Sequence, residues 1–215
     1  MSTIPLEAAL TSLAIKRPIF HSEADFQHTL AWELRERDPE CVMRLEYKPP
    51  HFIERAYLDI WARRNDTVMA IELKYKTRRL SVTLGEEDFD LKDQSAQDLG
   101  RYDFVKDLQR LEKVVSGRES TVGYGVFLTN DSAYWTPPRD TQTVDADFRV
   151  HQGRIVTGEL RWGPGASAGT MHSREQAILL TGVYKFDWQD YSRPFKGPYG
   201  TFRYVVARVG GEPAG

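Results

Sequence analysis

The side chains most able to do chemistry together are two acids and a lysine within residues 58–74. Asp59 lies in one run of alternating apolar and polar residues, and Glu72 and Lys74 lie two apart in the next run. Alternation with a period of two is typical of β-strands with one buried face. Carboxylates are hard oxygen donors that suit magnesium, and a nearby ammonium can stabilise charge that develops on a phosphate. The three side chains therefore predict metal-assisted hydrolysis.

A tight turn between the two runs fixes how they face each other. The pair Asn65–Asp66 tolerates positive φ, as a two-residue hairpin loop requires. Counting back from this loop places Asp59 directly opposite Glu72, with Cβ atoms roughly 4.5–5.5 Å apart. Two like charges so placed repel each other unless a cation lies between them. Lys74 shares the face of Glu72 because it lies two residues further along the strand.

An Asp followed across a hairpin by Glu-x-Lys resembles the motif of the PD-(D/E)XK nuclease superfamily. Asp59, Glu72 and Lys74 carry the resemblance, which covers roughly residues 20 to 130. Leu58 stands where the superfamily's name has proline, at a position that varies within it. The resemblance implies an α/β fold in which a mixed central sheet is flanked by helices, a restriction-endonuclease-like core. It also implies hydrolysis of phosphodiesters with Mg²⁺, or with Mn²⁺ in its place.

A helix before the hairpin offers a third acid. Ser22 as N-cap and Asp25 three residues later form a capping-box pattern, and the helix should continue to about Arg37. Members of the superfamily often use an acid of this helix at the metal site, so the resemblance makes Glu23 the candidate. The helix dipole alone also explains an acid in the first turn. Both interpretations of Glu23 stay open.

The long helix predicted over residues 93–116 carries candidate substrate contacts. Gln94, Asp98 and Arg101 recur on one face, with Tyr102 beside them. Some members of the superfamily have Gln-x-x-x-Tyr on this helix, lining the nucleic-acid groove, and Asp98-x-x-x-Tyr102 has that spacing. Asp98 and Arg101 are equally compatible with an ion pair on the helix surface, which would contribute little stability.

The charge of the chain bears on its partner. With 29 basic and 31 acidic residues the net charge is −2, which argues mildly against a protein that coats nucleic acid. A candidate basic patch nevertheless leaves the second strand of the hairpin toward the following loop, at Lys74, Lys76, Arg78 and Arg79. We expect Lys76 to contact substrate phosphate, and a solvated strand end is the alternative explanation.

The rest of the chain predicts a single domain. Residues 1–135 should form the nuclease-like α/β core with an N-terminal helix, and residues 136–215 a β-rich C-terminal elaboration. Residues 184–199 interleave aromatic and basic side chains, a mixture that suits base stacking with phosphate contact as well as an ordinary strand face. Further elements are expected as a helix over 5–15, strands over 42–47, 80–84, 88–91 and 122–128, and strands within 154–162, 177–188 and 201–209.

Cellular location is expected from what the sequence lacks. A single cysteine, Cys41, suits a reducing compartment and excludes an internal disulfide. There is neither a signal-peptide pattern at the N-terminus nor an apolar run of the ~20 residues that would span a bilayer. We expect a cytoplasmic protein without a membrane partner.

These observations favour a magnesium-dependent nuclease that acts on DNA. Asp59 and Glu72 would hold the metal with the carbonyl of Leu73, Lys74 would orient or activate the attacking water, and Glu23 would assist. The alternative is a catalytically inactive, nuclease-like module that binds nucleic acid or protein. Glycoside hydrolysis by paired carboxylates would leave Lys74 without a role. Cutting both strands of a duplex would favour a homodimer, which no sequence feature shows.

Overall fold

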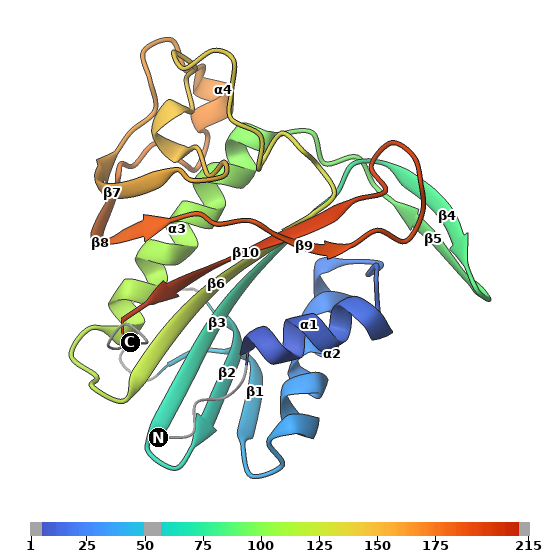
Figure 1. Cartoon of the computed structure of the whole chain (residues 1–215). Helices are drawn as coiled ribbons and strands as arrows, with labels where there is room; N and C mark the ends of the chain where they lie inside the picture. The colour runs from blue at the N-terminus through green and yellow to red at the C-terminus, as the bar shows by residue number, and fades with distance from the viewer. Residues whose placement is uncertain (1–5, 50–56, 211–215) are drawn as a thin grey trace.

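The computed structural model of the protein describes residues 6–49 and 57–210 (Figure 1). Its elements in chain order are α1 Leu6–Lys16, α2 Glu23–Arg37, β1 Val42–Tyr47, β2 Leu58–Arg64, β3 Thr67–Lys76, β4 Leu80–Leu84, β5 Glu87–Leu91, α3 Gln97–Val115, β6 Thr121–Thr129, the 3-10 helix η1 Ala146–Phe148, β7 Ile155–Leu160, α4 Ala168–Met171, β8 Ile178–Lys185, β9 Gln189–Ser192 and β10 Phe202–Val209.

Six strands form the central sheet, in the order β1-β2-β3-β6-β10-β9. β3 and β6 run parallel and are connected through α3, whereas every other neighbouring pair is antiparallel. The predicted mixed α/β sheet flanked by helices is confirmed. Residues 136–215 also contribute to this sheet, because β10 pairs with β6 and β9 pairs with β10.

The hairpin forms with the predicted register over most of its length. Arg64 pairs with Thr67 and Ile60 pairs with Ile71, as a loop at Asn65–Asp66 requires. Asn65 has φ 51°, the left-handed conformation that its residue type tolerates. The ladder ends at Ile60, so the expected direct pairing of Asp59 with Glu72 is absent from it.

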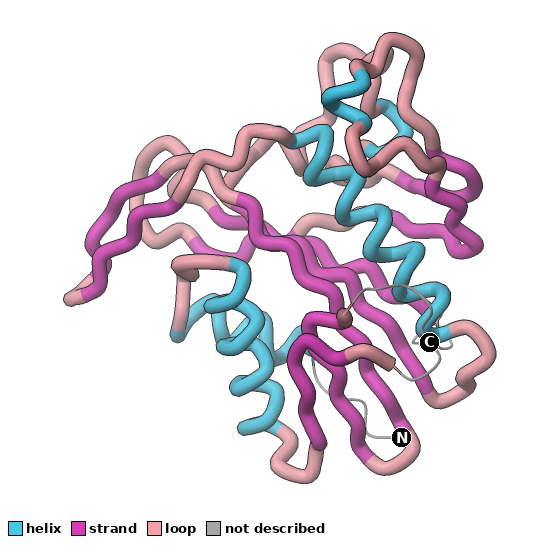
Figure 2. Tube along the Cα trace, turned by 180° about the vertical axis from the view of Figure 1, so that it is seen from behind, coloured by secondary structure: helices cyan, strands magenta, loops and turns pink. Residues whose placement is uncertain are grey.

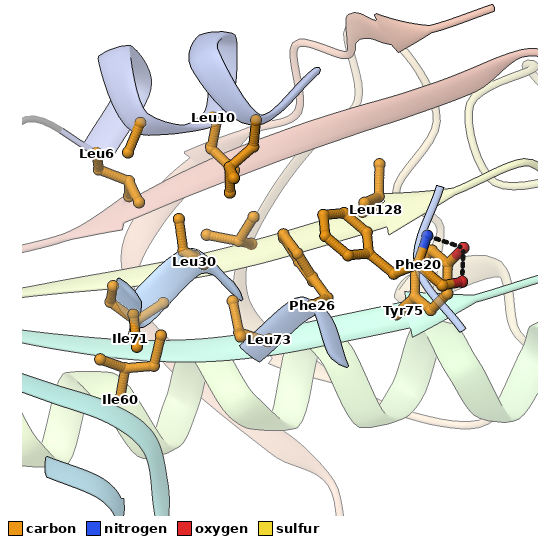
Figure 3. Close-up of a cluster of buried hydrophobic side chains, with 14 of the residues drawn as sticks. Leu6, Leu10, Phe20, Phe26, Leu30, Ile60, Ile71, Leu73, Tyr75 and Leu128 are labelled. Atoms are coloured by element: carbon orange, nitrogen blue, oxygen red, sulfur yellow. Dashed lines mark hydrogen bonds between the residues drawn. The ribbon is translucent and has the colours of Figure 1, made fainter. Parts of the chain in front are cut away.

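One face of the central sheet is covered by α1 and α2. Leu6 and Leu10 of α1 lie over the sheet together with Phe26 of α2, and all three side chains are fully buried (Figure 3). Tyr75 of β3 joins the same cluster, and its hydroxyl donates a hydrogen bond of 2.9 Å to the carbonyl of Phe20. This side of the sheet is an apolar core, and the contact with Phe20 ties the loop before α2 to β3.

The opposite face is covered by α3, seen from behind in Figure 2. Phe104, Leu108 and Leu111 are buried on this helix, in the same cluster as Phe127 of β6. The β7–β8 hairpin packs on α3 as well, and Tyr184 of β8 donates a hydrogen bond of 2.7 Å to Glu112. The β4–β5 hairpin projects from the body as an arm (Figures 1 and 2).

The strongly patterned elements match their predicted bounds closely, and the start of α3 does not. α2, which ends at Arg37, and β1 coincide with the prediction, whereas Pro5 of the first predicted helix lies outside the described residues. α3 begins at Gln97 rather than at residue 93. Gln94 is instead held by Thr77, the residue after β3: the N–H of Gln94 donates to the Thr77 carbonyl, and its side-chain oxygen accepts the N–H of Thr77. β9, η1 and α4 were not predicted.

Within residues 6–49 and 57–210, no helix combines the length and the apolar character that crossing a membrane requires.

Close packing of α3 on β6 gives a test of the fold. A Cβ at Gly125 would lie 2.5 Å from Cδ2 of Leu108 and 3.2 Å from Phe104, both buried. We expect Gly125→Ala to lower the free energy of unfolding by about 1–3 kcal/mol through overpacking, measured by chemical denaturation. Gly169→Ala is the matched control because its nearest neighbour would lie at 3.8 Å. Equal stability of the two variants would contradict this packing.

Candidate functional site

The candidate site lies where β2 and β3 part. Beyond the last paired residues, side chains rather than a neighbouring strand satisfy the backbone. The N–H of Leu73 donates to Oδ2 of Asp59 at 2.5 Å, and the N–H of Tyr75 donates to Oε2 of Glu23 at 2.7 Å. On the other strand, the carbonyl of Asp59 accepts from Nε2 of Gln27 at 2.7 Å. Buried backbone groups need such partners. Where β2 and β3 separate, the carboxylates of Asp59 and Glu23 therefore accept the N–H groups of β3.

Glu72 points to the α3 side of the sheet and is 2% exposed. Its carboxylate is bound by both branches of Arg110 on α3, with Nε to Oε1 at 2.7 Å and Nη2 to Oε2 at 2.9 Å. A two-point guanidinium–carboxylate pair of this kind is strong and directional. Glu72 is therefore held by a cation of the chain itself.

Lys74 lies on the same face, as its spacing from Glu72 predicts. Its Nζ is 2.6 Å from Oδ2 of Asp107, one turn before Arg110 on α3. Arg110 also contacts Asp107, with Nη2 2.5 Å from Oδ1. The charges alternate from Glu72 through Arg110 and Asp107 to Lys74, and this buried row joins β3 to the helix.

Burial and crowding shift the protonation of these groups. Burial raises the pKa of Asp59 to about 6, against the lowering effects of the Leu73 N–H and of Lys74. Burial and the neighbouring Asp107 also raise the pKa of Glu72 well above its ordinary range, although Arg110 opposes the shift. Burial works against the charge of Lys74, yet Asp107 and Glu23 outweigh it and raise its pKa. Lys74 stays protonated at neutral pH.

The side chains around Lys74 and Arg110 are of the kind that bind divalent cations in other proteins. Four carboxylates, those of Glu23, Asp59, Glu72 and Asp107, interact around the side chains of Lys74 and Arg110. The carboxylates outnumber the cations by two, and the pKa is raised by burial for Asp59 and Glu72. Hard oxygen ligands of this type suit Mg²⁺ and Mn²⁺.

The acids expected to hold a metal have protein partners in the structure, and their binding of a metal stays a prediction. In the part of the chain that the structure describes, no group of three or more His, Cys, Asp or Glu side chains is placed to hold a metal ion. Both oxygens of Glu72 bind Arg110, and Glu23 and Asp59 each accept a backbone N–H of β3. Leu73 pairs with Val126 in the parallel ladder. A cation that used Glu72 would have to take it from Arg110.

Two of the residues expected to contact substrate are structural. Arg101 is 5% exposed, and its guanidinium lies 2.5 Å from Asp145 and donates to the carbonyl of Ala133 at 2.7 Å. Tyr102 is 4% exposed and stacks on Trp162, with ring centroids 5.5 Å apart. The face chosen from spacing is covered by the C-terminal third of the chain, so neither side chain lines a groove.

The remaining expected contacts lie near the end of β3. Gln94 is tied to Thr77, and Asp98 accepts the N–H of Leu99 at 2.9 Å within α3. Lys76 lines two hollows, one of about 250 Å³ shared with Glu23 and Gln94, and one of about 400 Å³ at the start of α3. Lys76 therefore lies at the end of β3 near Glu23, and its contact with substrate stays a prediction.

The residues that sequence reasoning missed are Asp107, Arg110 and Gln27. Each is a polar residue on the inward side of a helix, and Asp107 and Arg110 share one side because they lie three apart. The available signal was the lysine at position 74: a buried strand lysine needs an acid, and the following helix is the nearest place for one. Sequence spacing alone does not predict which acid of the helix pairs with Lys74.

No protein-family model, curated protein or solved structure matches this chain.

The raised pKa of Asp59 predicts a stability difference that depends on pH. Because the folded pKa is about 6 against an ordinary 3.8, ionising Asp59 costs stability as pH rises through this window. Asp59→Asn keeps an acceptor for the Leu73 N–H and removes that cost. In EDTA we expect the variant to exceed the wild type in free energy of unfolding by about 1–3 kcal/mol at pH 8 and to match it near pH 4. Asp66→Asn, in the exposed turn, is the control, and a difference independent of pH would contradict the assignment.

Proposed function

We propose that the protein is a metal-dependent nuclease that hydrolyses phosphodiester bonds, with DNA as its polymer. One observation supports the proposal: Asp59 and Asp107 lie close enough to both Glu72 and Lys74 to shift the pKa values of these two side chains, and Glu23 does the same to Asp59 and Lys74. The resemblance to the PD-(D/E)XK pattern adds the reaction type. Stability alone does not account for the buried Glu72–Arg110 and Lys74–Asp107 pairs, because apolar residues of similar volume would stabilise the fold at least as well.

Asp59 and Glu72 would hold the metal, with the Leu73 carbonyl and Glu23 at its edge. A bound Mg²⁺ would supply Lewis acidity toward a phosphate oxygen and lower the pKa of a coordinated water. Asp107 holds the Lys74 ammonium at 2.6 Å. Because Lys74 remains protonated, it would orient the water and stabilise charge on the phosphate rather than accept a proton.

Lys76 would extend this site along the strand. It lies two residues beyond Lys74 on the same face of β3, and it lines the two hollows of about 250 and 400 Å³. A lysine there can contact the phosphate next to the one that is cleaved. The proposal also includes a cytoplasmic location, where the buried thiol of Cys41 would stay reduced.

A nuclease assay on purified protein tests the proposal. We expect cleavage of supercoiled, linear or single-stranded DNA with Mg²⁺ or Mn²⁺ and none with EDTA. Glu72→Gln and Lys74→Ala should each lower the rate by at least about 100-fold, as expected when a charged group of the reacting site is removed. Glu36→Gln, exposed on α2, is the control. Cleavage unchanged in both site variants would overturn the assignment.

A second candidate function is a nuclease-like module that binds without cutting. The observation that favours it is the bond of both Glu72 oxygens to Arg110, a permanent cation where a metal would otherwise be needed. In such a module the Glu72–Arg110 pair would replace the metal and fix β3 to α3. Nucleic acid or a protein would then bind without hydrolysis.

Removing Arg110 separates the two candidates. In EDTA, Arg110→Gln should lower the free energy of unfolding by about 3–5 kcal/mol, because Glu72 and Asp107 lose a buried partner. If these residues are a metal site, Mg²⁺ or Mn²⁺ should raise the melting temperature of the variant more than that of the wild type. Arg110→Lys, which keeps the charge, provides a better-folded comparison. An absence of metal stabilisation in all three proteins would favour the inactive module.

A further inference from the structure

A hollow of about 630 Å³ opens where β6 ends and β10 begins. Its lining is polar and aromatic, and it lies within the C-terminal third and the loop after β6, outside the resemblance to the nuclease pattern. The residues of its lining that matter here are Asn130, Trp135, Asp190, Arg193, Tyr199 and Arg203. The volume is in the range of pockets that hold small organic ligands.

The C-terminal end of β3, the strand that carries Glu72 and Lys74, contacts the wall of the hollow. Lys76 pairs with Thr129, the last residue of β6, and Asn130 follows directly. The side chain of Asn130 accepts the N–H of Arg78 at 2.7 Å, so the end of β3 contacts the wall of the hollow. From Glu72 to Lys76 the strand spans four residues, roughly 13 Å at about 3.3 Å per residue. A substrate strand several nucleotides long would be needed to extend from the acids past Lys76 to the hollow.

Tyr199 presents its ring at the rim of the hollow and is 41% exposed. Its φ of 62° is unusual for a residue with a side chain, and such conformations gather at ligand-binding positions. Asn130 fixes the turn by donating to the carbonyl of Tyr199 at 3.1 Å. The guanidinium of Arg78 lies 5.2 Å from the ring centroid. The ring is thus positioned by its neighbours while one part of it faces solvent.

The other aromatic and the charges complete the lining. The guanidinium of Arg203 lies 5.9 Å from the ring centroid of Trp135. Asp190 pairs with Arg203 at 2.9 Å and with Arg193 at 2.8 Å, so one carboxylate faces two guanidinium groups. These three side chains carry a net positive charge, and Arg193 is exposed. An aromatic surface beside a cation suits a base with its phosphate.

We propose that this hollow binds one unpaired nucleotide of a nucleic-acid strand, with its base on Tyr199 and its phosphate at Arg193. The inference rests on the proposed function, since it takes the same polymer as the partner. It adds a substrate form, because a base inside a duplex cannot stack on a protein ring. The strand reaching the acids is therefore single-stranded, or unpaired at this nucleotide.

Equilibrium binding in EDTA tests the inference separately from cleavage. A fluorescently labelled single-stranded oligonucleotide and its duplex are titrated with protein and followed by anisotropy. Tyr199→Ala should weaken binding of the single strand by about 5- to 100-fold, the loss expected for one stacked base, and should leave duplex binding within about twofold. Tyr199→Phe, which keeps the ring, should bind like the wild type. Trp32→Ala removes an aromatic that is 70% exposed on α2 and is the matched control.

Salt dependence tests the phosphate contact. Arg193→Gln should flatten the slope of log affinity against log salt by about 0.7, the value for one phosphate of a single strand. Melting temperatures of all variants establish that they are folded. Single-strand binding unchanged in Tyr199→Ala and Arg193→Gln would overturn the inference even if DNA is cleaved. Binding that depends on Tyr199 would support it even if no metal produces cleavage, which would sink only the hydrolytic part of the proposed function.

Discussion

The parting of β2 and β3 is the constraint from which the rest of the candidate site follows. A sheet edge buried under helices cannot leave its N–H groups without partners. Here Asp59 and Glu23 provide the acceptors, and Gln27 serves the carbonyl of Asp59. Carboxylates thus satisfy the backbone of a sheet in the interior, where ionised groups are costly. The contacts that satisfy the N–H groups of β3 also bring the carboxylates of Asp59 and Glu23 close to this strand.

α3 compensates for that concentration. Asp107 and Arg110 extend the charges of β3 into a row of alternating sign, so that helix and strand share buried ion pairs as well as apolar packing. Such pairs contribute little net stability compared with apolar packing, but the loss of one member is costly. A functional role explains these ion pairs better than stability does, because they control the charge of Lys74 and the position of Glu72. Asp107 keeps Lys74 charged, and Arg110 fixes the position of Glu72. Both residues lie in the C-terminal half of β3, which ends at Lys76.

Local patterns predicted much of the fold, and tertiary partners decided what they could not. The Asn65–Asp66 loop fixed the hairpin register because turn chemistry and alternation agree over a few residues. The same count placed Asp59 opposite Glu72, but the ladder ends at Ile60, so this pairing does not form and the site set stays a prediction. Arg101 failed as a substrate contact because its partner, Asp145, lies in a segment with no periodic signal to place it. The role of Arg110 could not be predicted either. Helical spacing shows which residues share a face of the helix, but it does not show which element packs against that face.

The strand order of the central sheet also determines which parts of the molecule can form first during synthesis. All acids of the candidate site, with Lys74 and Arg110, belong to elements complete by Thr129, whereas Tyr199 and Arg203 arrive with the β9–β10 segment. β10 must then pair with β6 across more than seventy intervening residues, a contact of high sequence separation that forms slowly. During synthesis, the charged row can therefore assemble while the outer edge of β6 still lacks its partner. A chain stopped at that stage would hold every acid of the site but expose an unpaired strand, a known route to aggregation.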